Sequence, residues 1–177
     1  MEELDQCALF SEALAGIGFD LPTDVVDHIV HLDHSAYSNS ISVAPAVLET
    51  LSLLRGHSYR LGLVSNLTLL PELIRADLER MGLAAQLDAM VFSSEVGVRK
   101  PDARIFREGL TRLGAEAAAT VFVGDRLYDD VSGAQAVGMR AVQTRQFRQE
   151  DDPSFRPVAI IDHLEELPGA LKRFGGP

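Results

Sequence analysis

The spacing of apolar residues changes character near residue 40 of the chain. Before that point it follows the helical period, and a first predicted helix holds Leu4, Ala8, Leu14 and Ile17. A second helix is predicted to begin near Thr23 or Asp24, either of which would cap it, and to end at about Ser38. The polar residues 38–42 then indicate a hinge. Residues 1–41 are therefore predicted to form a helical segment distinct from the rest.

From residue 42 onward, short apolar runs alternate with longer amphipathic stretches. The apolar runs predict buried strands at 61–64, 89–93, 120–124, 140–144 and 158–161. The other stretches predict helices at 45–56, 69–80, 101–113 and 128–137, and a last helix with Leu164 and Leu171 that Pro168 breaks or bends. Strands separated by helices pair in parallel through right-handed crossovers. The predicted fold class is therefore α/β, a three-layer doubly wound parallel sheet over residues 42–177.

Polar residues at the carboxyl ends of the strands are candidates for function, because ligands of doubly wound sheets bind there. Ser65 and Asn66 follow the run 61–64, and their hydroxyl and amide can donate hydrogen bonds to an anionic oxygen. The same pair is also typical of a turn or a helix cap. Lys100 stands before Pro101 at a predicted helix start, where an ammonium beside free backbone N–H groups suits phosphate. A loop lysine is otherwise commonly only solvated.

Three carboxylates gather after the predicted buried strand 120–124. Asp125 stands at the tip of that strand, and Asp129 and Asp130 follow within the next turn. Clustered carboxylates repel one another unless a cation or hydrogen-bond donors offset their charge, and hard oxygen ligands suit Mg²⁺. The structural alternative is that Asp129 or Asp130 is the N-cap of the next helix. For Asp125 this alternative is weaker, and the cluster predicts a magnesium site to which it belongs.

Together these segments resemble the haloacid dehalogenase (HAD) superfamily of phosphohydrolases, from residue 45 to about 144. The matching segments are 61–66 for its second motif, 98–102 with 105–106 for its third, and 123–125 followed by 130–134 for its fourth. The resemblance implies that Ser65, helped by Asn66, holds a phosphoryl oxygen and that Lys100 neutralises the phosphate. It also implies that Asp125 ligates Mg²⁺ and that Asp130 supports or shares that metal. The segment before residue 38 resembles the latter part of the small helical cap that closes such sites.

The first motif of that family, an apolar strand ending in Asp-x-Asp-x-Thr, does not occur in this sequence. In the family it supplies the nucleophile and the general acid/base. Removing a covalent nucleophile costs on the order of 10⁶ in rate, or about 8 kcal/mol of barrier. Residues 19–23 echo the motif only superficially, because Pro22 stands where the second carboxylate should be, and Asp33 lies inside a helical pattern. We therefore expect the 177-residue chain by itself to be inactive or weakly active.

The missing motif also has a structural consequence. In the family's sheet the first-motif strand lies between the strand that ends at Ser65 and the one that ends at Asp125. Without it, both strands have unpaired backbone groups, so they pair with each other, another chain fills the gap, or the fold is compromised. We predict direct pairing of the two strands. The simplest hypothesis for the missing motif is a truncated start, with Met1 inside the cap of a longer parent enzyme.

Charge and composition narrow the classes of partner. The formal net charge of −10 repels phosphodiester backbones and anionic lipid surfaces, so we expect no nucleic-acid or membrane binding. The single cysteine, Cys7, cannot form an internal disulfide, and no apolar run approaches the roughly 20 residues of a membrane-spanning helix. We therefore expect a cytoplasmic protein, and the family resemblance implies that its partner is a small phosphorylated metabolite. Its oligomeric state stays open.

A histidine series in the second predicted helix is a possible transition-metal site. His28, His31 and His34 recur every three residues, and Asp24 and Asp27 lie four residues before the first two. We prefer to interpret the series as a solvated helix face with local ion pairs, because a three-residue step drifts around the helix.

Two functions from different classes are consistent with the sequence. The first is a phosphatase-type, Mg²⁺-dependent hydrolase, and the second is a non-catalytic phosphate-binding or interaction module with the same fold. A dehalogenase is less favoured, because the paired acids Asp125 and Asp130 suit a metal, whereas carbon–halogen displacement in that family does without one. A plain dinucleotide-binding domain is weaker still, since no Gly-x-Gly-x-x-Gly turn follows any predicted strand.

Overall fold

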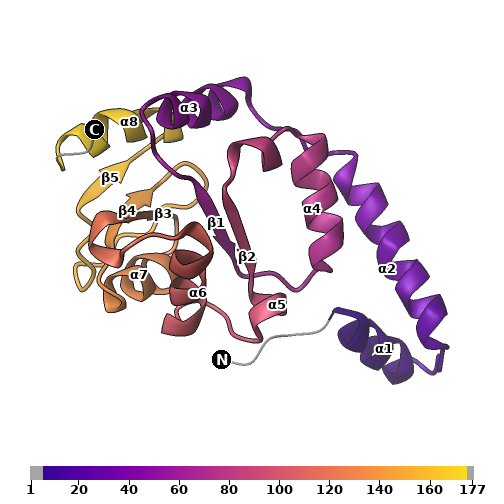
Figure 1. Cartoon of the computed structure of the whole chain (residues 1–177). Coiled ribbons are helices and arrows are strands. Elements are labelled where there is room, and N and C mark those ends of the chain that lie inside the picture. Colours follow the sequence, from indigo (N-terminus) through magenta and orange to yellow (C-terminus); the bar gives the residue numbers. More distant parts are fainter. Residues whose placement is uncertain (1–5, 175–177) are drawn as a thin grey trace.

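The computed structural model describes residues 6–174, so Leu4 and the first part of the predicted segment 1–41 lie outside the described residues. The strands, drawn in Figure 1, are β1 (Gly62–Ser65), β2 (Ala89–Phe92), β3 (Val121–Gly124), β4 (Arg140–Thr144) and β5 (Ala159–Ile161). The α-helices are α1 (Gln6–Gly16), α2 (Thr23–Ser38), α3 (Pro45–Gly56), α4 (Pro71–Arg80), α5 (Ser93–Val96), α6 (Ala103–Leu113), α7 (Gly133–Ala136) and α8 (Leu167–Lys172). Shorter turns are η1 (Ala84–Gln86), η2 (Ala117–Ala119) and η4 (Leu164–Glu166), and η3 (Leu127–Ser132) is a π-helical turn.

Proline and glycine set several of the predicted helix boundaries. Pro45 and Pro71 lie in the first turn of α3 and α4, where a missing backbone N–H breaks no helical hydrogen bond. Gly114 ends α6 in the left-handed conformation, with φ of 60°. Pro168 lies in the first turn of α8, so it starts a short helix rather than bending a long one.

The predicted cap of α2 is wrong, and so is the structural alternative in which Asp129 or Asp130 caps the helix after β3. Pro22 is the N-cap residue of α2, and neither Thr23 nor Asp24 caps it. Asp129 and Asp130 lie inside the π turn η3, whose N-cap residue is Arg126. From its position inside this turn, Asp130 accepts a hydrogen bond from the N–H of Arg126, the residue that precedes the turn.

Every strand pair in the described residues is parallel, which agrees with the α/β prediction. β1 pairs with β2, and Leu63 lies opposite Met90. The other three strands form a second sheet in the order β3-β4-β5. The sheet is thus divided into a two-stranded part and a three-stranded part.

The predicted direct pairing of β1 with β3 is wrong. Within the described residues, β1 pairs with β2 alone and β3 with β4 alone. The free edges of both strands line one cavity of about 770 Å³, to which α3, α6 and α8 contribute Leu54, Leu110 and Leu171. Side chains of these helices thus line the space between β1 and β3, where the prediction had the two strands in contact.

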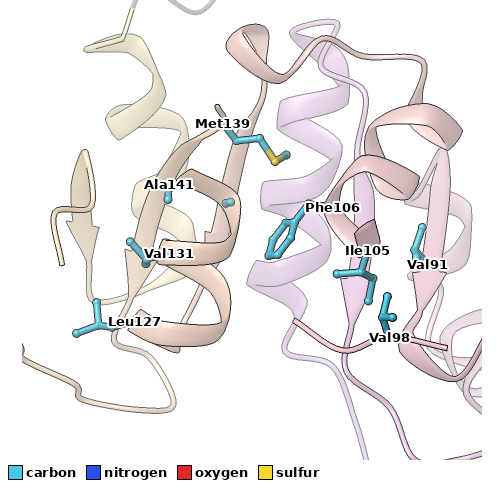
Figure 2. Close-up of a cluster of buried hydrophobic side chains, with 9 residues drawn as sticks. Val91, Val98, Ile105, Phe106, Leu127, Val131, Met139 and Ala141 are labelled. Atoms are coloured by element: carbon cyan, nitrogen blue, oxygen red, sulfur yellow. The ribbon is translucent and has the colours of Figure 1, made fainter. Parts of the chain in front are cut away.

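Helices cover both faces of the strands and make a three-layer arrangement. One core cluster joins the two parts of the sheet through α6, and Figure 2 shows Phe106 between the residues around the π turn and β4 on one side and Ile105 and Val91 on the other. Phe106 also meets Phe122 of β3 edge-on, with ring centroids 5.1 Å apart. A second cluster on the opposite face unites α3 and α8 with β4 and β5.

The strands beside the cavity are less buried than their apolar sequences predict. The residues of β3 are all of intermediate exposure, and those of β1 are intermediate or exposed, whereas Ala141, Val142 and Gln143 of β4 are fully buried or nearly so. β4 has a neighbouring strand on each side, and β1 and β3 each have only one. The difference therefore follows from the open edges.

The helices α1 and α2 pack on each other and project beyond α4, as Figure 1 shows. Where α2 meets α4, the buried His34 Nε2 lies 2.9 Å from Asp77 Oδ2, and Ser38 and Arg80 also bond to Asp77. The solvated histidine face is therefore wrong for His34, because a carboxylate from another helix draws it inward. None of the helices among residues 6–174 is both long and apolar enough to cross a membrane.

Candidate functional site at the carboxyl ends of β1 and β3

Lys100 is held at the end of β1 by the amide of Asn66. Asn66 Oδ1 accepts a hydrogen bond from the Lys100 N–H at 2.6 Å, and Asn66 Nδ2 donates to the Lys100 carbonyl at 3.1 Å. Ser65 Oγ makes only a long hydrogen bond, 3.4 Å, to Asn66 O. The amide therefore positions the lysine, while the hydroxyl is weakly engaged and available to another acceptor.

The ammonium of Lys100 lies between β1 and β3. Its Nζ donates to Val64 O at 3.2 Å, lies 2.6 Å from Asp130 Oδ1, and stands 5.5 Å from the centroid of the Phe122 ring. The side chain is only 13% exposed. At most two of its three N–H donors meet these oxygens, so one is left for a ligand.

Asp130 is almost completely buried and faces the same ammonium. Its Oδ2 accepts a hydrogen bond from the Arg126 N–H at 3.0 Å, which satisfies the first free donor of the π turn. Its Oδ1 is paired with Lys100 but has no well-aligned hydrogen bond. This oxygen thus keeps capacity to accept a further donor or to approach a cation.

Two glycines allow the elements of the site to come close. A Cβ on Gly124 would lie 2.4 Å from the Cβ, Cγ and Oδ2 atoms of Asp130. A Cβ on Gly133 would lie 2.4 Å from the Phe106 ring and 3.0 Å from the backbone of Pro101, the residue after Lys100. The end of β3, the π turn and the Lys100 loop therefore pack at distances that a larger residue does not permit.

Asp125 and Asp129 point to other partners. Asp125 Oδ2 lies 3.6 Å from Arg148 Nε, and its side chain is one-third exposed. Asp129 Oδ2 accepts from Arg126 Nη1 at 3.2 Å. The structure thus brings Lys100 and Asp130 into contact at the end of β1. Asp125 directly follows Gly124, the residue that packs on Asp130.

The family model for "Haloacid dehalogenase-like hydrolase" matches residues 18–144, which is well over half of the chain. The chain belongs to this family. The match begins within the N-terminal helical part and ends with β4, so it includes all the candidate site residues.

Relatives of this HAD-like hydrolase include named phosphatases. It is 33% identical to a glyceraldehyde 3-phosphate phosphatase from Methanopyrus kandleri, over 89% of this chain and 72% of that protein. It is 39% identical to a ribulose-1,5-bisphosphate 5-phosphatase from Halopiger xanaduensis, over 61% of this chain and 44% of that protein. The chain thus spans less than three quarters of one relative and less than half of the other.

The fold is also that of a solved dehalogenase. A crystal structure of a 2-haloacid dehalogenase from Pseudomonas syringae pv. Tomato matches with a TM-score of 0.74 and 28% identity, over 96% of this chain and 70% of that one. The HAD-like fold is therefore shared with proteins named for two different reactions.

The residues of this HAD-like hydrolase offer Mg²⁺ a small set of oxygen ligands. Mg²⁺ in proteins commonly binds one or two carboxylates and keeps several waters. The part-exposed Asp125 suits such a water-rich ion, whereas Asp130 Oδ1 is buried against the Lys100 ammonium. No group of three or more His, Cys, Asp or Glu within residues 6–174 is arranged to enclose a metal.

Sequence reasoning missed two residues around the site. Ser93, fully buried after β2, accepts from the Leu67 N–H at 2.7 Å and so fixes the loop that follows Asn66. It was the last residue of a predicted strand, and the rule that favours strand ends would have found it. Arg148 comes from the loop after β4, and no local sequence pattern connects it with Asp125.

Proposed function

We propose that this chain carries the phosphate- and magnesium-binding part of a phosphomonoester hydrolase that acts on a small phosphorylated metabolite. The placement of the Lys100 ammonium supports this most directly. The Lys100 side chain is mostly buried, and the main-chain N–H and C=O of this lysine are both fixed by hydrogen bonds. Its ammonium still has a free N–H donor, which suits a compact anion. The names of the phosphatase relatives supply the substrate class.

Each candidate residue has a separate proposed task. Lys100 binds a phosphoryl oxygen through its remaining N–H, and the Ser65 hydroxyl donates to another. Asn66 acts through Lys100, as a positioning residue, because its amide is already bonded to the Lys100 main chain. Residues 1–41 serve as part of a cap, and residues 42–177 as the core.

Asp125 is proposed as the direct ligand of Mg²⁺, with Asp130 sharing the metal or its water. When bound, Mg²⁺ neutralises negative charge on phosphoryl oxygens. Asp130 has a second task, because its Oδ1 also balances the charge of Lys100. Loss of Asp130 would leave that ammonium buried without its counter-ion.

Hydrolysis further requires an attacking group. Neither Asp20 nor Asp33 is proposed as the nucleophile. Both are exposed, and both belong to the helical part that packs on α4. We therefore expect very slow or no turnover by the purified chain. Phosphate binding without turnover is the alternative function, and the absence of an Asp-x-Asp-x-Thr segment favours it.

The test measures binding and turnover separately on the purified 177-residue protein. Titration calorimetry with inorganic phosphate, with and without Mg²⁺, is expected to show binding that Mg²⁺ strengthens. Asp125→Asn should remove the strengthening by Mg²⁺, and Lys100→Met should weaken binding in both conditions. Asp24→Asn, at an exposed position of α2, is the matched control. Absence of phosphate binding at millimolar concentrations, by protein with an intact circular-dichroism spectrum, would refute the proposal.

Hydrolysis of p-nitrophenyl phosphate decides between the enzyme and the binding module. Turnover that disappears in Asp125→Asn would favour an enzyme that is active by itself. Binding with no turnover above the background rate would favour the non-catalytic alternative.

A further inference from the structure

The loop that follows β4 brings an arginine to the carboxyl end of β3. Arg148 Nε lies 3.6 Å from Asp125 Oδ2 and 3.8 Å from Glu150 Oε1, so one guanidinium stands between two carboxylates. All three side chains are part-exposed. A small ion from solvent therefore has access to the same carboxylate of Asp125 that Arg148 faces.

The two distances of Arg148 are longer than those of other arginine pairs in the chain. Arg104 Nη2 lies 2.8 Å from Asp102 Oδ2, and Arg75 Nη2 lies 2.7 Å from Glu95 Oε1. A hydrogen-bonded pair of this kind has an N–O distance of about 2.7–3.2 Å, which Arg148 Nε exceeds toward both of its acids. Arg148 is thus attracted to two carboxylates without being fixed to either.

The chain on both sides of Arg148 is held in place. Gln146 Oε1 accepts a hydrogen bond from the Leu164 N–H at 3.0 Å. Glu150 O accepts one from Nε2 of the almost fully buried Gln143 at 2.8 Å. The side chain of Arg148 can consequently change its partner while the loop around it stays where it is.

Glu150 is fixed as a second acceptor for this guanidinium. Its Oε2 accepts a hydrogen bond from the Leu127 N–H at 2.8 Å, at the start of the π turn η3. Its Oε1 faces Arg148. A movement of the guanidinium by about 1 Å would bring Arg148 Nε within hydrogen-bond distance of that oxygen.

Mg²⁺ on Asp125 would place a second cation at the carboxylate that Arg148 faces, and the two positive charges would repel each other. We propose that Arg148 is a displaceable counter-ion of Asp125, which weakens Mg²⁺ binding and moves to Glu150 when the metal binds. The inference rests on the proposed function, because it takes Asp125 as the metal ligand. It adds a residue that sets the metal affinity of the site without touching the metal.

Titration calorimetry of the full chain with magnesium chloride alone, at low ionic strength, tests whether Arg148 competes with the metal. Arg148→Met should bind Mg²⁺ about two- to fivefold more tightly than the unmodified protein. Arg156→Met is the matched control and should leave the affinity unchanged. It removes the same charge from the same loop, where Arg156 Nη1 donates to Phe155 O at 3.0 Å. Weaker or equal binding by Arg148→Met would overturn the inference, and equal gains in both variants would overturn it in favour of a net-charge effect.

The transfer to Glu150 is tested by a double-mutant cycle. Glu150→Gln keeps an acceptor for the Leu127 N–H but removes the charge that receives the guanidinium. It should weaken Mg²⁺ binding by about two- to fivefold in the unmodified protein and by much less in Arg148→Met. Equal weakening in the two backgrounds would overturn the transfer, because it would show that Glu150 acts on the metal without Arg148.

The NMR signal of the Arg148 Nε–H group reports the change of partner directly, and its loss in Arg148→Met assigns it. Mg²⁺ should shift this signal and slow its exchange with water. The Nε–H signal of Arg104, which is bonded to Asp102 Oδ1 at 3.1 Å, should keep its position. An unmoved Arg148 signal at Mg²⁺ concentrations that saturate the protein in calorimetry would overturn this inference alone. Absence of Mg²⁺ binding by every variant would overturn the proposed metal site together with it.

Discussion

Asn66 and Lys100 are joined by a pair of hydrogen bonds from one amide to both main-chain groups of the lysine, at 2.6 Å and 3.1 Å. The residues are 34 positions apart in sequence, so the pair connects the loop after β1 to the loop before α6. The position of the ammonium therefore depends on a neutral side chain that does not need to touch a ligand.

Asn66→Ala is expected to lower both stability and phosphate affinity. The substitution leaves a part-buried N–H and C=O of Lys100 without their partner, which costs about 1–3 kcal/mol. Phosphate affinity should fall by about tenfold as Lys100 loses its fixed position. Urea unfolding and titration calorimetry measure the two effects. The control is Asn39→Ala, whose exposed amide bonds only within its own helix end, at Ser35 O; equal losses in the two variants would contradict a positioning role.

Gly124→Ala is expected to disturb Asp130 and through it Lys100. The new Cβ would overlap the Asp130 side chain at 2.4 Å, and overpacking of this kind costs about 1–3 kcal/mol. Urea unfolding should show the loss. Gly16→Ala is the matched control, because no atom lies within 4 Å of its added Cβ. A Gly124→Ala protein as stable as the control would show that the π turn yields without strain.

The Asp77 cluster is expected to make stability depend on pH in the acidic range. Burial alone raises the pKa of Asp77, but the hydrogen bonds from Ser38 and Arg80 and the interaction with His34 outweigh it, so the pKa lies below the ordinary 3.8. A lowered pKa stabilises the folded protein above the unfolded value and ceases to do so as pH falls through the folded value.

Asp77→Asn should therefore be less stable than the unmodified protein by about 1–3 kcal/mol near pH 7, and the difference should shrink below about pH 4. Urea unfolding of both proteins between pH 7 and pH 3 measures it. Asn39→Ala, at the end of the same helix that holds His34, removes no titratable group and is the control. A difference that stays constant with pH would assign the effect to packing instead of charge.

Asp102→Ala is expected to destabilise α6 by about 1 kcal/mol. Asp102 is the N-cap residue, its Oδ1 accepts from the Arg104 N–H at 2.9 Å, and the Arg104 guanidinium holds the pKa of Asp102 well below its usual range. Thermal or urea unfolding measures the loss. Asp102→Asn keeps an N-cap acceptor and should recover most of the stability; a protein as unstable as the alanine variant would contradict capping as the cause.

Local chemistry made much of the fold predictable. Pro45 begins α3 and Gly114 ends α6 for reasons that lie within a few residues of sequence, and β4 begins and ends at the predicted residues. The strand-end rule also selected Lys100 and Asp130 as candidates, and the structure brings their side chains into contact. In each of these cases, residues within one turn or at one strand end were enough to make the prediction.

Long-range packing explains the predictions that were wrong. His34 is buried because Asp77, 43 residues away, lies opposite it, and the helical pattern around His34 contains no trace of that partner. The predicted pairing of β1 with β3 failed for a related reason, since side chains from three helices that are distant in sequence line the space between the two strands. The alternative of Asp130 as a helix cap failed because Asp130 lies inside a π turn and packs on Gly124, and the local sequence does not show that turn.

The core cluster around Phe106 determines how the protein should unfold. Val91 on the two-stranded side and Ala141 on the three-stranded side pack into the same cluster through α6, although no ladder of main-chain bonds crosses from β1 to β3. Cooperativity between the halves consequently resides in side-chain packing against one helix. Both halves should melt in a single transition, and the slowest-exchanging amides should be those of α6.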